Sequence, residues 1–143
     1  MKTKLLITFL ISLTLLSCMR NYDDENAQRS RIVDIIENVR IGFIQFNPDK
    51  IMSNYHPDYR HFGIDYTSQR FIWQNETLKY NYMEVEILEI DLFDDYAIAR
   101  FLLKYRDTNN TYGPYVEPDY QGYFSYFYYE KGEWWIYGNQ QRH

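Results

Sequence analysis

The sequence predicts an α+β domain in which helices pack against one face of an antiparallel sheet. Apolar residues between positions 29 and 80 recur with helical spacing. The segments after position 82 are instead rich in β-branched and aromatic residues. Because the helical segments all precede the strands and do not alternate with them, an α+β arrangement is favoured over a parallel α/β sheet.

The N-terminal segment has the features of a bacterial export signal. Lys2 and Lys4 precede an apolar run, residues 5–16, that is too short to span a bilayer as a helix. The run ends in the letters LLSC, which resemble the lipobox of bacterial lipoproteins, although an ordinary signal peptide with an incidental cysteine is the alternative. The resemblance implies a signal peptide over residues 1–17, cleavage before Cys18 and acylation of Cys18 with groups such as palmitate. We expect the exported protein to be anchored by lipid to a bacterial membrane, outer or cytoplasmic, without crossing it.

Composition narrows the possible partners of the exported domain. Cys18 is the only cysteine, so its lipidation would leave no disulfide and stability must come from a core. Without Lys2 and Lys4 the chain has 13 basic and 20 acidic residues, a net charge of -7, which argues against binding nucleic acid. Sixteen tyrosines, nine phenylalanines and three tryptophans indicate a large aromatic core, an aromatic binding surface, or both.

The helices are expected in the first half of the exported chain. Residues 18–28 are polar and acidic and are interpreted as a lipidated tether. From Arg29 a helix is predicted, with one stripe formed by Ile32, Val33, Ile35, Ile36, Val39, Phe43, Ile44 and Phe46. Asn47 and Pro48 are typical of a helix start, so a second helix should run to about Tyr55. Thr67 or Ser68 would cap a third helix, which ends near Tyr80.

Four strands are expected after the third helix. They cover residues 83–90, 96–107, 123–130 and 133–140. In the second of them, Ala97, Ala99, Phe101 and Leu103 share one face without a polar residue, while Arg100 and Lys104 take the other.

Three short motifs resemble the NTF2-like, or SnoaL-like, superfamily in their order and spacing. They are His56-Pro57-Asp58-Tyr59, Asp95-Tyr96-Ala97 and Lys131-Gly132-Glu133-Trp134-Trp135-Ile136. The resemblance covers residues 29–143 and implies a cone with helices packed on a curved antiparallel sheet. It also implies a pocket between the concave sheet face and the helices, and dimers formed through the sheet. Fold alone gives no activity, because the superfamily includes isomerases, cyclases and non-catalytic binding domains.

The last two strands can be paired from their turn. If Lys131-Gly132 is a two-residue turn, Glu130 faces Glu133, Phe127 faces Ile136, Ser125 faces Gly138 and Tyr123 faces Gln140. The resemblance places Trp134 and Ile136 inside the cone, so Ser125 and Gly138 would be small inward residues. Their missing volume leaves room either for a small apolar ligand or for a helix side chain. The candidate pocket residues are Tyr59, His61, Tyr123, Ser125, Gly138 and Gln140.

The other face of this hairpin is also aromatic. It comprises Phe124, Tyr126, Tyr128, Trp135 and Tyr137. Such rings are favoured at protein contacts, so a homodimer through the sheet is the first interpretation. A protein or glycan partner and a solvated tyrosine-rich surface are the alternatives, and a turn shifted by one residue would exchange the two faces.

Residues 55–63, YHPDYRHFG, raise the question of catalysis. His56, Asp58 and His61 match no established metal-ligand spacing, so we expect neither a metal nor another cofactor. The resemblance implies that Asp58, Tyr59 or His61 could act in an isomerase or hydrolase. The alternative is a structural loop in which Pro57 stops the second helix, Asp58 forms a turn and Gly63 reverses the chain. The favoured hypothesis is a membrane-anchored lipoprotein with a non-catalytic domain that binds a ligand or a protein.

Overall fold

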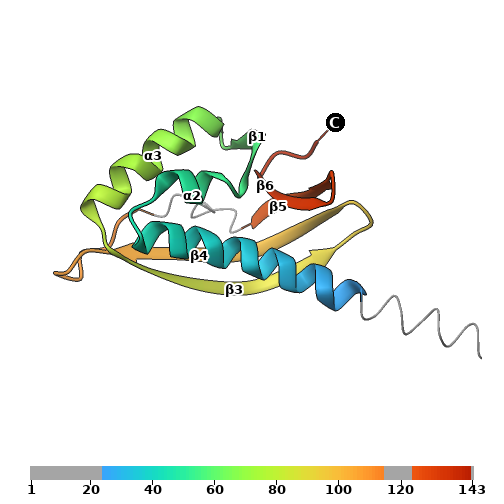
Figure 1. The fold of residues 1–143 in the computed structure, drawn as a ribbon, viewed down its shortest axis with the longest axis horizontal. Coiled ribbons are helices and arrows are strands. Elements are labelled where there is room, and N and C mark those ends of the chain that lie inside the picture. The colour runs from blue at the N-terminus through green and yellow to red at the C-terminus, as the bar shows by residue number, and fades with distance from the viewer. Residues whose placement is uncertain (1–23, 115–123, 143) are drawn as a thin grey trace, which may run out of the picture.

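The computed structural model describes residues 24–114 and 124–142 (Figure 1). An N-terminal helix covers residues 24–44 and is followed by α2 (Pro48–Met52) and α3 (Tyr66–Lys79). The strands are β1 (Tyr55–His61), β2 (Ile64–Asp65), β3 (Tyr82–Leu92), β4 (Tyr96–Arg106), β5 (Phe124–Glu130) and β6 (Glu133–Gly138). Figure 1 shows the helices together on one side of the long β3–β4 hairpin, which is the predicted α+β arrangement.

The strands form one six-stranded sheet in the order β2-β1-β6-β5-β4-β3. Neighbouring strands are antiparallel except for β1 and β6, which run parallel. The four predicted strands are confirmed, and the sheet gains β1 and β2 from residues that were predicted to form a loop. That loop prediction is wrong because α2 ends early and the chain then joins the edge of β6. The Ile136 N–H donates to the carbonyl of Asn54 (2.9 Å) at the point where β1 starts.

The N-terminal helix is longer than predicted and buries part of the predicted stripe, whereas Val33, Ile44 and Phe46 are exposed and Phe46 lies beyond the helix end. Ile32, Ile36, Val39 and Phe43 are at most 1% exposed. Residues 24–28, which the sequence assigned to a tether, are already helical. An i,i+4 ion pair between Arg29 and Glu25 (3.0 Å) supports this first part of the helix, which has no apolar stripe of its own.

Side-chain caps set the limits of the two later helices. Asn47 Oδ1 accepts the Lys50 N–H (3.0 Å), and Pro48 occupies the first turn of α2, as predicted. Asn54 closes α2 by donating its side-chain amide to helix carbonyls, so the helix ends at Met52 and does not reach Tyr55. The N-cap of α3 is Asp65, whose carboxylate accepts the Ser68 N–H (2.8 Å), and the predicted caps Thr67 and Ser68 lie inside the helix.

The core lies between the helices and the inner face of the sheet. Alternate residues of β4 face it as predicted, and Ala97, Ala99, Phe101 and Leu103 are at most 1% exposed. Rings from three elements meet above this floor. They are Phe43 of the N-terminal helix, Trp73 of α3 and Tyr105 of β4. Trp134 and Ile136 also belong to this core, as the family resemblance implied.

The register of the β5–β6 hairpin is as predicted near the turn and shifts further along. Lys131 and Gly132 both have positive φ, and Glu130 faces Glu133 while Phe127 faces Ile136. The predicted pairing of Ser125 with Gly138 is wrong, because the register shifts by one residue and Gly138 faces Tyr126. The shift is a bulge on β6, with Gly138 at φ +84°. The predicted partner of Gln140, Tyr123, lies outside the described residues.

Candidate functional site

The residues proposed for acid-base chemistry lie on two sides of β1. Tyr59 and His61 point into the core and are each 1% exposed, and their rings stack 6.5 Å apart. The side chain of Asp58 is 74% exposed, because successive residues of a strand face opposite sides of the sheet. An interior site that combines Asp58 with Tyr59 or His61 is therefore not formed.

The small residues that were proposed to leave room for a ligand pack against other parts of the protein. A Cβ atom on Gly138 would lie 2.0 Å from the carbonyl oxygen of Arg60, so the glycine allows β1 to approach β6. Ser125 is fully buried and faces Ala99 across β4 and β5. Gln140 is exposed beyond the end of β6, and Tyr123 and Cys18 lie outside the described residues. Of the predicted pocket residues, the structure brings Tyr59, His61 and Gly138 together.

The inner face of α3 carries a row of polar groups that the sequence did not reveal. Gln69, Trp73 and Glu76 follow one another at helical spacing and are all at most 8% exposed. Together with Tyr105 of β4 we call them the interior polar row. The Tyr59 hydroxyl donates to Gln69 Oε1 (3.4 Å). Two buried nitrogen atoms of the row, Gln69 Nε2 and Trp73 Nε1, have no hydrogen-bond partner among the described residues, whereas the Tyr105 hydroxyl lies against the Glu76 carboxylate.

Tyr105 is held in its protonated form. Burial is the largest cause that raises its pKa far above the ordinary value, and the negative charge of Glu76 adds to it. Glu76 itself pairs with Lys79 (3.0 Å) at the edge of the core. A phenol that does not ionise can donate a hydrogen bond but cannot act as a base. The interior polar row can thus orient a polar group, which is a property of binding sites.

Metal binding finds no support in the described part of the chain. No three His, Cys, Asp or Glu side chains gather there in an arrangement that could hold an ion. His56 and His61, which were considered together in the sequence analysis, are separated by the sheet because they lie on opposite sides of β1.

No described helix is both long and apolar enough to cross a membrane.

The face of the sheet opposite the helices carries the second aromatic group. This group comprises the predicted residues Phe124, Tyr126, Tyr128, Trp135 and Tyr137, together with Tyr96 of β4. We call these six residues the outer ring surface. Tyr126 lies 6.1 Å from Tyr128, and Tyr96 packs 5.9 Å from Tyr128, between ring centroids. Phe124, Tyr126 and Trp135 remain partly exposed.

The C-terminal residues cover one end of the outer ring surface. The Arg142 N–H donates to the Tyr128 hydroxyl (2.9 Å), and the Arg142 guanidinium pairs with Glu130. Tyr128 and Tyr137 are consequently only 7% exposed. The rings of the surface that remain accessible are therefore those of Phe124, Tyr126 and Trp135.

His56 of β1 contacts this covered end of the outer ring surface. Its ring stacks on Tyr137 at 4.8 Å, its Nδ1 accepts the Asp58 N–H (3.1 Å), and its Nε2 lies 3.4 Å from a Glu130 oxygen. This geometry suits a neutral imidazole with its proton on Nε2. Burial, the largest effect, lowers the pKa of His56, although the charge of Asp58 acts in the opposite direction.

The lowered pKa of His56 predicts a pH dependence of stability. Because the folded protein binds this proton less readily than the unfolded chain, the free energy of unfolding should fall as pH drops below about 6.5. The His56 contribution to the slope is at most about 1.4 kcal/mol per pH unit. Urea denaturation between about pH 5 and pH 7.5 should give a shallower slope for His56→Gln than for the wild type. Identical slopes would show that His56 does not carry this effect.

Several solved structures resemble the chain in fold. An NTF-2 like protein of unknown function from Shewanella oneidensis has a TM-score of 0.61 and 12% identity, and the match covers 78% of this chain and 95% of that one. Rv3472(D26N), a protein of unknown function from Mycobacterium tuberculosis, has a TM-score of 0.60 and 9% identity, with 81% and 71% covered. Bd1075 of Bdellovibrio bacteriovorus has a TM-score of 0.61 and 17% identity, with 82% of this chain covered but only 41% of Bd1075.

The likeness establishes the fold of the chain and nothing finer. No protein-family model matches it, and neither does any curated protein. The described residues have the NTF2-like fold, with helices on one side of a curved six-stranded sheet.

Proposed function

We propose that this NTF2-like domain is the exported part of a membrane-anchored bacterial lipoprotein and that it binds a protein without catalysing a reaction. The observation that carries the proposal is the outer ring surface. Phe124, Tyr126 and Trp135 present partly exposed rings on the side of the sheet that faces away from the helices. Tyrosine and tryptophan give large contact areas at interfaces at a small cost in side-chain entropy.

A second copy of the chain is the partner that this surface suits first. A twofold dimer places the same patch on both sides, so rings would meet rings. Two ion pairs of the same sheet face lie beside the rings. Arg100 pairs with Glu89 (2.9 Å) and Lys104 with Glu86 (2.6 Å), so these four charges are balanced within the chain.

The non-catalytic part of the proposal rests on β1 and β4. Asp58 faces away from Tyr59 and His61, and the β4 floor below them is apolar. The interior polar row supports a second mode of binding, in which a ligand is held between α3 and β4. Its groups are an amide, an indole, a paired carboxylate and an un-ionised phenol, which orient a ligand more readily than they transform it.

The dimer can be tested with two charges on the outer ring surface. Tyr126→Glu with Trp135→Glu should weaken association about 100-fold or more, because desolvated aromatic residues at an interface centre contribute about 2 kcal/mol or more each. The mass in solution should be measured by sedimentation on protein that also carries Cys18→Ala, so that no lipid anchor interferes. The double variant should then be monomeric at concentrations where the parent is dimeric.

The matched control places the same charges on α3. Phe71→Glu with Leu78→Glu alters two apolar residues that are 65% and 84% exposed on a helix, away from the outer ring surface. This variant should remain dimeric. A parent protein that is monomeric even at high concentration would refute the homodimer. A different protein would then be the proposed partner of the outer ring surface.

A further inference from the structure

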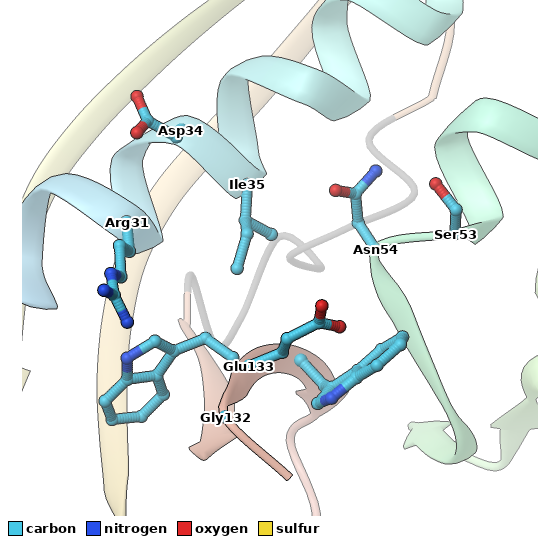
Figure 2. Close-up of a pocket in the computed structure, with 9 residues that line it drawn as sticks. Arg31, Asp34, Ile35, Ser53, Asn54, Gly132 and Glu133 are labelled. Carbon is cyan, nitrogen blue, oxygen red and sulfur yellow. The ribbon is translucent and has the colours of Figure 1, made fainter. Parts of the chain in front are cut away.

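A cleft of about 380 Å³ opens beside the β5–β6 turn, and it shares Trp135 with the edge of the outer ring surface (Figure 2). The N-terminal helix, the end of α2 and the start of β6 form its walls. Ile35 points into it, and Trp134 and Trp135 supply aromatic surface. The volume lies within the range of about 300–1,000 Å³ that is usual for small-molecule sites.

Asn54 places a fixed acceptor in this cleft. Its Nδ2 group donates to the carbonyls of Lys50 (2.9 Å) and Ile51 (3.1 Å), and its own backbone carbonyl accepts the Ile136 N–H. Since carbonyls accept and never donate, the amide orientation is determined and Oδ1 must face the other way. Figure 2 shows that oxygen turned to the cleft. Asn54 is only 8% exposed, and no described residue donates to Oδ1.

Two carboxylates line the same cleft. Asp34 comes from the N-terminal helix and Glu133 from the first position of β6. In the described ranges neither forms an ion pair with a basic side chain. Arg31 also borders the cleft, so the three charged residues of its lining carry a formal net charge of -1. Figure 2 shows the Glu133 carboxylate turned toward Asn54 and the Asp34 carboxylate turned away from it. A cation beside Asn54 would therefore meet the Glu133 carboxylate, whereas an anion there would be repelled by it.

We propose that this cleft binds a small organic cation, an alkylammonium or alkylguanidinium group. The cationic head would donate hydrogen bonds to Asn54 Oδ1 and to the carboxylate of Glu133. The alkyl part would contact Ile35, and the indole surface would favour the charge through cation–π attraction. A free molecule and a lysine or arginine side chain present the same chemistry, and the test below distinguishes these two sources.

The test uses n-butylguanidinium and its neutral isostere n-butylurea on the full chain. Binding is followed by NMR through the side-chain amide of Asn54 and the indole N–H of Trp135. The cation should produce saturable shifts at both groups, and the urea should bind at least about tenfold more weakly because it lacks the charge. N-acetyl-arginine amide serves as the peptide arm of the test. Tighter binding of this compound than of n-butylguanidinium assigns a peptide source, and the reverse order assigns a free molecule.

Matched variants locate the binding. Glu133→Gln should weaken the binding of n-butylguanidinium about tenfold, whereas Glu84→Gln, which removes an exposed carboxylate of β3, should leave it unchanged. Three results would overturn the proposal. They are equal binding of the urea, equal weakening by Glu84→Gln, and no saturable shift by about 20 mM cation. None of these results bears on the dimer, since the cleft variants leave Phe124 and Tyr126 intact.

Discussion

Replacing Gly138 with alanine is expected to lower the free energy of unfolding by about 3 kcal/mol or more. Gly138 adopts φ +84°, a conformation that costs a residue with a Cβ about 1–2 kcal/mol. The new Cβ would also lie 2.0 Å from the carbonyl oxygen of Arg60, a backbone atom that cannot move aside alone. That carbonyl accepts the Asn139 N–H (3.1 Å), so the clash would separate β1 from β6. Urea denaturation followed by circular dichroism measures the loss.

Gly132 provides the matched control for this substitution. It lies in the same hairpin at φ +88°, but nothing approaches within 4 Å of the position of an added Cβ. Gly132→Ala should therefore lose only the conformational part, about 1–2 kcal/mol. The difference between the two variants isolates the contact between β1 and β6. Equal losses would contradict the inference that Gly138 is required by close approach of the two strands.

The fold class and the later strands could be predicted because their signals are local. The β5–β6 turn contains Gly132 and sets the pairing of the next residues, and alternation along β4 identified its buried face. The bulge at Gly138 could not be predicted, because its cause is the parallel strand β1, far away in sequence. Gly138 was interpreted as leaving space for a ligand, although the backbone of Arg60 fills that space.

β1 was mistaken for a loop for a related reason. Pro57 and Asp58 disfavour strands, and the pairing that overrides them is formed with β6 near the other end of the chain. The ladder tolerates Pro57 because the register between β1 and β6 shifts between Tyr55 and Arg60, which is where the proline lies. Once these residues form a strand, its alternation decides the chemistry, since Asp58 and Tyr59 must face opposite sides of the sheet.

The interior polar row was missed because helical spacing was used to find apolar stripes. On α3 the buried positions include Gln69, Glu76 and Thr77 together with Trp73, so the inner face of the helix has no apolar pattern to recognise. The sequence did contain a usable signal, because the polar residues Gln69 and Glu76 lie at helical spacing from Trp73. A buried glutamine and glutamate on one helix face cost stability unless they are partnered, which makes them better site candidates than the histidines.

Replacing Cys18 with alanine is expected to abolish membrane attachment completely. The proposed anchor depends on a thioether at that sulfur, and alanine offers no nucleophile for acylation. Two or three acyl chains hold a protein at a membrane because each buried CH₂ contributes about 0.8 kcal/mol, and their loss leaves an acidic domain with no comparable affinity. Metabolic labelling with a fatty acid and separation of membrane and soluble fractions measure the result in cells that express the full chain.

Ser12→Ala is the control for this last substitution, because it alters the apolar run of the signal and keeps Cys18. That variant should still be labelled and still sediment with membranes, while Cys18→Ala should be unlabelled and released. A Cys18→Ala protein that remains on the membrane without label would refute the lipid anchor and point to an uncleaved N-terminal segment. The outer ring surface would be unaffected by that outcome, since its first ring is Tyr96, on the folded sheet and distant in sequence from Cys18.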